Sequence, residues 1–334
     1  MSDPSTSNAY SPSTSPSRSR WIVTRAVASP ICLLSDQPAR RADQNGPADS
    51  LLILAIAAAA CTVLGRLAAR QDSASRTPAI RPLAWLNLWT AVTFLAFFLG
   101  VAIYGAVVVF TLGASFAPLS VTAWSGFQAA RGNASTRPGR AQWWAVCLLA
   151  GLGSSLVAAL GWSDSRGIMA LLAAAALGVV DGLAAGGVAV VSRRLGRDVA
   201  GVRQVMAHRY YATAVVASAA LLVLVPSGAI PAPSMPLSAS IAAALGSLVV
   251  PLFLIQYAIQ RLSPVLVTAA LALVPAIALF VEIAGGRTVN WPAVVLGLLI
   301  VPASLAVFAA EHRHECGRGR MTAPRVSLAV PQPR

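Results

Sequence analysis

Two long stretches of the chain contain no charged side chain. Residues 82–130 and residues 210–260 lack Asp, Glu, Lys and Arg. An apolar stretch of about 18 residues or more with few charges is typical of a helix that spans a lipid bilayer. A soluble domain carries about 25% charged residues, whereas only 11% of this chain is charged. The sequence therefore predicts an all-α integral membrane protein.

Nine apolar runs, separated by Pro, Gly and Arg, predict nine membrane spans. They cover residues 51–66, 83–113, 116–130, 141–163, 167–192, 210–225, 237–260, 262–283 and 291–310. The run at 116–130 is short and continues into a polar loop, so we expect a truncated helix there. Residues 1–50 begin with a Ser/Pro-rich segment, which predicts disorder. A tenth span over residues 21–35 stays open, because that segment is short and contains Arg25 and Pro30.

The net charge of +14 comes entirely from arginine, because all 25 basic residues are Arg. We interpret this charge as topological and not as a nucleic-acid site, because most arginines fall in alternate loops. These loops hold Arg66 to Arg81, Arg131 to Arg140, Arg193 to Arg209, and Arg261. Arginine-rich loops face the cytoplasm in membrane proteins. We therefore expect a multi-pass protein of the inner (plasma) membrane, with residues 311–334 as a disordered cytoplasmic tail.

An internal similarity indicates a repeat. Residues 99–123 align with residues 245–269 at an offset of 146, and both contain the pattern Pro-x-x-Val-Thr-Ala, starting at Pro118 and Pro264. The number of helices between the copies is odd, so the copies would have opposite orientations. Weak symmetry of this kind is typical of secondary transporters that bind solute near the middle of the membrane between two repeats. We expect residues 51–163 and 167–310 to form one bundle each.

The C-terminal part resembles the EamA family of the drug/metabolite transporter superfamily. The resemblance lies in "YAIQRLSPVLVTAALALVPAIALFVEIAGGRTVNWPAVVLGLLIVPASLAV" (257–307), with Pro264, Pro275 and Glu282 at matching places. It implies ten helices in two five-helix repeats, and export or import of small metabolites. We expect nine or ten transmembrane helices in two inverted five-helix repeats for this chain. The chain departs from the family pattern at Val274 and Val281, where many members have Glu and Gly.

Asp181, in the middle of "LGVVDGLAAGG", is the strongest candidate for a functional side chain. An unpaired charge at the bilayer centre costs about 2.5–3.5 kcal/mol on insertion scales, so Asp181 should face the interior of the bundle. It could contact a substrate amine or carry a proton, or it could form a structural hydrogen bond to a neighbouring helix. Beside it, Gly178, Gly182 and Gly186 form a small-residue stripe that allows two helix backbones to approach closely.

Five further polar residues interrupt apolar helices. Asn87, Tyr104, Gln256 and Tyr257 could bind a solute between the repeats, or could form hydrogen bonds between helices. Glu282 lies near a helix end, where it could couple transport to an ion or pair with Arg287.

No phosphate-binding loop, nucleophile elbow or dinucleotide motif occurs in the sequence, so we predict neither an enzyme nor a cofactor. The spacing of His312, His314 and Cys316 fits no standard metal site. We expect a secondary transporter, chiefly an exporter of small metabolites such as amino acids or drug-like solutes. A membrane accessory or lipid-handling protein that has lost transport is the alternative, and it is favoured by the short run at 116–130. The sequence leaves a homodimer open.

Overall fold

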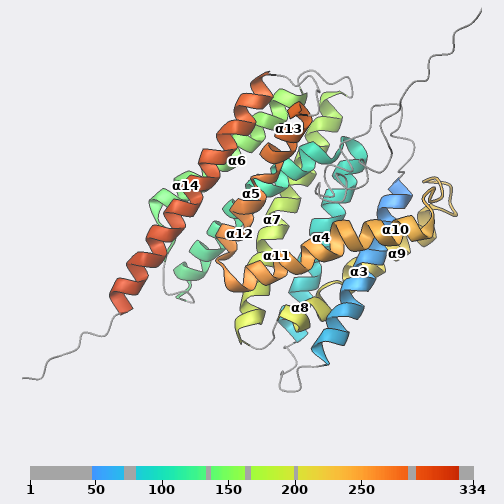
Figure 1. Cartoon of the computed structure of the whole chain (residues 1–334), viewed down its shortest axis with the longest axis horizontal. Helices are drawn as coiled ribbons and strands as arrows, with labels where there is room; N and C mark the ends of the chain where they lie inside the picture. Colours follow the sequence, from blue (N-terminus) through green and yellow to red (C-terminus); the bar gives the residue numbers. More distant parts are fainter. Residues whose placement is uncertain are drawn as a thin grey trace, which may run out of the picture.

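The computed structural model describes residues 47–70, 80–132, 137–161, 167–198, 202–284 and 291–322, except for the side chains of 197, 198, 282, 284 and 314–322. The segment 21–35 lies outside the described residues. Within the described ranges the chain is helical and contains no strand (Figure 1). The helices are α3 Pro47–Ala69, α4 Ile80–Ile103, α5 Ala106–Ala130, α6 Arg140–Gly161, α7 Ile168–Asp198, α8 Val202–Arg209, α9 Tyr211–Leu224, α10 Leu237–Ala244, η2 Leu245–Val249, α11 Val250–Arg261, α12 Pro264–Leu271, α13 Val274–Ala284 and α14 Trp291–Thr322.

Nine helical segments among the described residues are long and apolar enough to cross a membrane, which confirms the predicted membrane class. Three of these segments combine several helices. The π-helix η2 joins α10 and α11 into one span, and α8 and α9 form another across a bend at Tyr210. A break separates α12 from α13 just before Pro275, because proline lacks the N–H that would continue the helical hydrogen bonds.

The predicted boundary between residues 83–113 and 116–130 is wrong. The chain breaks at Tyr104 and Gly105, and α5 has 25 residues, enough to span the membrane. Gly105 adopts a φ of 116°, a conformation that residues with a Cβ atom rarely reach. Because the residues on both sides of Gly105 are apolar, hydropathy gives no sign of the break. The helix at 116–130 is therefore not truncated.

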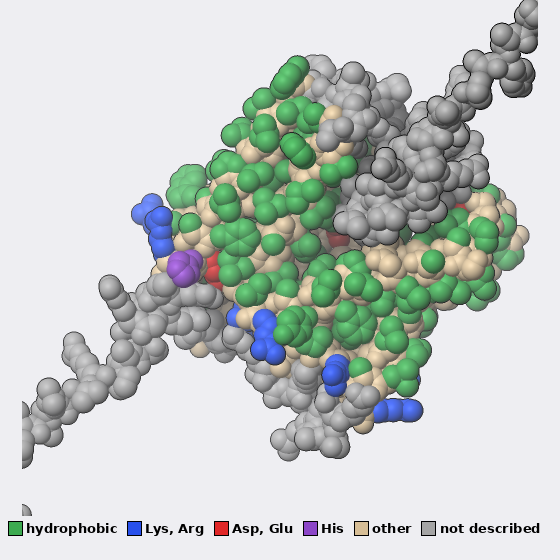
Figure 2. Space-filling model, in the orientation of Figure 1, with side chains coloured by type: hydrophobic (Ala, Val, Ile, Leu, Met, Phe, Trp, Pro, Cys, Tyr) green, Lys and Arg blue, Asp and Glu red, His purple; other side chains and the backbone are tan. Residues whose placement is uncertain are grey.

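The described surface is largely apolar. Trp144 and Leu222 are each 74% exposed and Trp291 is 77% exposed, and hydrophobic side chains cover most of the face in Figure 2. On that face the described arginine side chains lie along the left and lower edge. Several arginines stand at helix ends: Arg66 in the last turn of α3, Arg140 at the start of α6 and Arg261 at the end of α11. This distribution is what lipid around the middle of the bundle and water at its ends would require.

The helices pack into two lobes. We call α5, α6 and α12–α14 the α14 lobe; its core contains Val121, Leu149 and Ile300. We call α3 and α8–α11 the α3 lobe; its core contains Met206 and Tyr210. Helix α7 packs extensively against α5 of the α14 lobe and against α4, and it also contacts α11 and α8 of the α3 lobe, so that it joins the two lobes.

Each lobe contains helices from both predicted repeats. In the α14 lobe, α6 packs along α14, and in the α3 lobe, α3 packs along α8 and α9 (Figure 1). The expectation that residues 51–163 and 167–310 form one bundle each is therefore wrong.

The offset of 146 residues does not align equivalent helix positions. Pro118 lies inside α5, whereas Pro264 is the first residue of α12. Ser263 caps that helix, because its Oγ accepts a hydrogen bond from the backbone N–H of Leu266. Aligning the two prolines pairs the interior of one helix with the start of another. The chain breaks between α4 and α5 and between α11 and α12 are better markers for comparing the two segments.

Candidate functional site

Four charged side chains are buried among the described residues: Asp49, Asp181, Arg209 and Glu311. Asp49 and Glu311 lie near the ends of their spans and have hydrogen-bond partners. Asp181 and Arg209 lie in the interior of spans. Because a charge is costly in that environment, these two residues are the starting point for locating a functional site.

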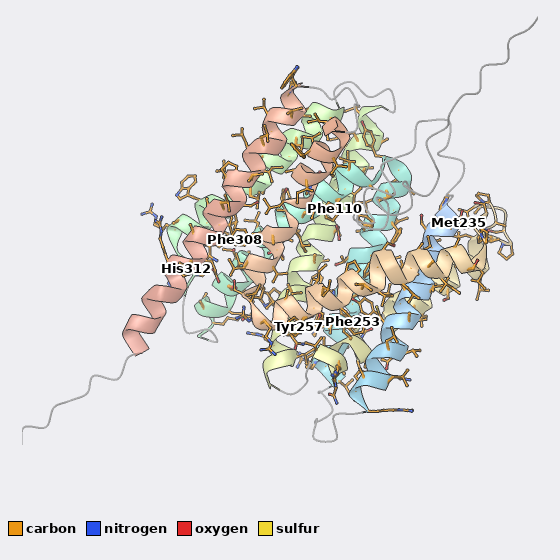
Figure 3. All side chains as sticks on the ribbon, viewed as in Figure 1. Phe110, Met235, Phe253, Tyr257, Phe308 and His312 are labelled. Atoms are coloured by element: carbon orange, nitrogen blue, oxygen red, sulfur yellow. The ribbon has the colours of Figure 1, made fainter. Side chains whose placement is uncertain are left out.

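Asp49 and Glu311 have structural roles. Asp49, at the start of α3, accepts hydrogen bonds from the backbone N–H groups of Ser234 (2.9 Å) and Met235 (3.0 Å), and from the Ser234 hydroxyl group (2.7 Å). These bonds fix the α9–α10 connection, which carries Met235 at the right of Figure 3. Gln142 Nε2 donates to Glu311 Oε2 at 2.8 Å, which links α6 to α14.

Asp181 lies on α7 at its contact with α5. It is 8% exposed, and a Cβ atom added at Gly113 of α5 would collide with its Oδ2. The predicted glycine stripe lines the same contact. A Cβ at Gly182 would come within 2.5 Å of the Gly113 carbonyl oxygen, and Gly178 and Gly186 also have α5 backbone within about 3 Å of such an atom. None of the described residues donates a hydrogen bond to Asp181 or forms an ion pair with it.

Arg209 is the last residue of α8 and is only 6% exposed. Its Nε donates to Thr90 Oγ1 of α4 (3.2 Å), and its Nη1 donates to Gln256 Oε1 of α11 (2.8 Å). The guanidinium carbon lies 5.2 Å from the centre of the Tyr210 ring, within the range of a cation–π contact. The guanidinium group is thus held by neutral partners on α4 and α11 and by the ring of Tyr210 at the bend between α8 and α9.

Two polar atoms beside Arg209 lack partners. Gln256 is fully buried, and its Nε2 makes no hydrogen bond, although its Oε1 is bound to Arg209. Tyr210 is 1% exposed, and its hydroxyl group is also without a partner. A buried polar group without a hydrogen bond costs about 1–3 kcal/mol. This cluster of Thr90, Arg209, Tyr210 and Gln256, the Arg209 cluster, is the candidate binding site.

Asn87 is part of the framework that positions Arg209. Its Nδ2 donates to the carbonyl oxygens of Leu83 (3.0 Å) and His208 (2.6 Å), and its Oδ1 accepts from the Ala212 N–H (3.2 Å). In a continuous helix the His208 carbonyl and the Ala212 N–H would be partners four residues apart. The Asn87 amide binds both groups instead, and so satisfies the bend between α8 and α9.

The other predicted residues do not gather at one place. Tyr257, next to Gln256 on α11, is 52% exposed and stacks near Arg261, with the guanidinium carbon 5.3 Å from the ring centre (Figure 3). Tyr104 is 5% exposed and packs with Val108 and Leu112 beside the α4–α5 break. Glu282 lies in α13, and its side chain lies outside the described part of the structure. Of the predicted polar residues, Gln256 is thus the one in the Arg209 cluster.

The hydropathy pattern places Arg209 in a loop, so the sequence does not mark it as a candidate for the site. The predicted span 210–225 contains only 16 residues, fewer than the roughly 20 that a bilayer requires. Extending this span toward the N-terminus would have placed Arg209 inside the membrane. The structure shows that extension, with a candidate span over Val202–Leu224.

Comparison with known proteins supports the fold only. No protein-family model and no curated protein matches the chain. Fifteen chains of solved structures match it. One of them, described as the crystal structure of a protein, has a TM-score of 0.59 and 17% sequence identity, over 83% of this chain and 95% of the other. The two proteins share the fold, and the length and composition of the described helices are those of a multi-pass membrane protein.

Proposed function

We propose that the chain is a secondary transporter, chiefly an exporter of small metabolites, that works by alternating access. The observation that carries this proposal is the burial of Asp181 and Arg209 inside spans with no charged partner among the described residues. Ionisable residues inside membrane spans usually mark the path of a solute or an ion, because their burial has no structural benefit that an apolar residue would not provide.

The proposal includes membership of the EamA family, with two inverted repeats. It is supported by the resemblance of residues 257–307 and by the similar chain breaks after α4 and after α11. The arginines at helix ends support a cytoplasmic C-terminus in the inner membrane. The alternative of a lipid-handling or accessory protein loses its main support, because α5 is a full span of 25 residues.

The arrangement of the lobes favours a rocking motion. Helix α7 contacts α5 of the α14 lobe through glycines that bring the two backbones close together, and it also contacts α11 and α8 of the α3 lobe. Such small-residue contacts let two helix backbones approach closely, and a shift of α5 along α7 is compatible with alternating access. Asp181 lies in this contact, where a change in its protonation or its partner would alter the packing of α5 on α7. In the absence of a nucleotide-binding motif, an ion gradient or the solute gradient would supply the energy.

The test is uptake by proteoliposomes. We expect wild-type protein to move labelled amino acids or drug-like cations across the membrane, and Asp181→Asn to lose most of this activity at normal expression and folding. Glu311→Gln is the matched control, because Glu311 is another buried acid but lies at a span end and is bound to Gln142. Wild-type protein without activity toward the whole panel would argue against transport. Full activity of Asp181→Asn would remove this residue from the mechanism.

A further inference from the structure

The charge of Arg209 has no counter-charge among the described residues. Its two hydrogen bonds go to a hydroxyl group and an amide oxygen, both neutral. A buried charge normally needs an opposite charge, because neutral hydrogen bonds recover only part of the lost hydration energy. The free protein thus carries a buried cation that is positioned but not neutralised.

The unused groups beside this cation are all suited to donate. The guanidinium group has five N–H bonds in a planar fork, and two of its nitrogens are engaged as described above. Gln256 Nε2 and the Tyr210 hydroxyl group have no hydrogen-bond partner. A set of donors around one fixed positive charge is complementary to an oxyanion.

We propose that the Arg209 cluster binds the carboxylate group of a small solute. This inference rests on the proposed transport function and names the class of its substrate. The guanidinium group would take both carboxylate oxygens, and Gln256 Nε2 and the Tyr210 hydroxyl group would donate to the same anion. The carboxylate of the bound solute would thus supply the opposite charge that Arg209 lacks.

A carboxylate fits this cluster better than a phosphate does. A phosphate monoester carries about −1.5 to −2 charges at neutral pH, whereas the cluster supplies a single cation. Arg66 does not belong to the cluster, because it is exposed and its Nε and Nη2 donate to the hydroxyl group of Tyr211 at 3.0 and 2.6 Å. Tyr210 belongs to a hydrophobic cluster that includes Cys61 and Met206, with Phe94 packed against it. We therefore expect the carboxylate to be attached to an apolar body.

A matched set of three solutes tests the proposal with purified full-length protein. L-leucine, 4-methylpentanoate and 3-methylbutylamine share the same branched body and differ in their charged groups. Thermal unfolding is measured with each solute at equal concentration and ionic strength. We expect the two carboxylate-bearing compounds to raise the unfolding temperature of the wild-type protein by about 2–4 °C at saturation, and the amine to cause no shift.

The most informative variant is Gln256→Glu. The new carboxylate would replace an amide that already contacts Arg209 at 2.8 Å, and would neutralise the guanidinium group from within the protein. We expect this variant to fold and to be as stable as the wild type, yet to lose the shift caused by 4-methylpentanoate. Arg209→Gln should lose it as well, and Tyr210→Phe should weaken binding about tenfold, the loss of one charge-assisted hydrogen bond.

Three outcomes would overturn the proposal. The first is that the amine shifts the wild-type protein as much as the acids do. The second is that neither acid causes a shift. The third is that Gln256→Glu responds to 4-methylpentanoate as the wild type does.

Flux measurements separate this inference from the proposed function. Shifts of the unfolding temperature that depend on the carboxylate, without uptake into proteoliposomes, would support the binding site and refute transport. Equal uptake by the wild type and Gln256→Glu, with no shift of the unfolding temperature by a carboxylate, would support transport and refute the site.

Discussion

At the scale of single residues, Asn87 shows how a polar side chain can be structural inside a membrane span. A bend within a span leaves backbone groups without partners, and lipid cannot provide them. The Asn87 amide supplies a donor to the His208 carbonyl and an acceptor for the Ala212 N–H. Asn87 therefore stabilises the bend at Tyr210. Because Arg209 lies between His208 and Ala212 in the chain, the same two hydrogen bonds fix its position.

Replacing Asn87 by alanine should destabilise the protein by about 1–3 kcal/mol, because two backbone groups lose their partners. The measurement is thermal or denaturant unfolding in detergent. Ser154→Ala is the control, because Ser154 donates only to the Ala150 carbonyl oxygen of its own helix. Equal stability of the two variants would mean that the bend does not depend on Asn87.

Sequence reasoning found part of the site at this scale. Asp181 and Gln256 could be selected because each interrupts an apolar helix, and both are buried in the structure. The same criterion selects Tyr257, which is half exposed. Successive residues of a helix point in different directions, and the packing of the helices decides which face is buried. Arg209 could not be selected while it was assigned to a loop. A pattern of residue types locates polar groups along the chain, whereas their pairing is decided by contacts between distant helices.

At the scale of elements, the contact of α5 with α7 depends on residues without side chains. A Cβ atom at Gly182 would lie 2.5 Å from the Gly113 carbonyl oxygen and 2.8 Å from Phe116 Cβ. Backbone atoms cannot move away as a flexible side chain can, so the helices would have to separate. The stripe therefore sets the distance between α5 and α7, and with it the burial of Asp181.

We expect Gly182→Ala to destabilise the protein by about 1–3 kcal/mol through overpacking. Gly151→Ala is the matched control in α6, because its added Cβ would have no heavy atom within 4 Å. This control should be neutral or slightly stabilising, since alanine favours the helix by about 1 kcal/mol over glycine. Unfolding temperatures of both variants provide the comparison. A neutral Gly182→Ala would show that the α5–α7 contact is looser than described.

Most spans could be predicted from hydropathy, but breaks between apolar helices could not. The spans at 141–163 and 237–260 agree closely with α6 and with α10–α11, because loops rich in Pro, Gly or Arg bound them. The break at Gly105 has apolar residues on both sides, and only its positive φ marks it. Backbone conformation of this kind is not visible in the hydropathy of a sequence.

At the scale of the whole molecule, the basic edge seen in Figure 2 predicts which ends of the helices face the cytoplasm. The connection between α9 and α10, held by Asp49, should then face the opposite side. A cysteine in place of the exposed Ala229 should react with a membrane-impermeant maleimide in intact cells, when the native cysteines are replaced. A cysteine in place of Arg70, after α3, should react only after the membrane is permeabilised. The reverse pattern would invert the proposed orientation.

The burial of Arg209 also has an electrical consequence. A charge held inside a span feels part of the membrane potential, which is worth about 2.3 kcal/mol per elementary charge for a full drop of 100 mV. If a solute whose one charge is a carboxylate neutralises the guanidinium group, the loaded site would be less sensitive to voltage than the empty site. The membrane potential would then act mainly on the step in which the empty transporter returns to its starting conformation, and would set the rate of that step.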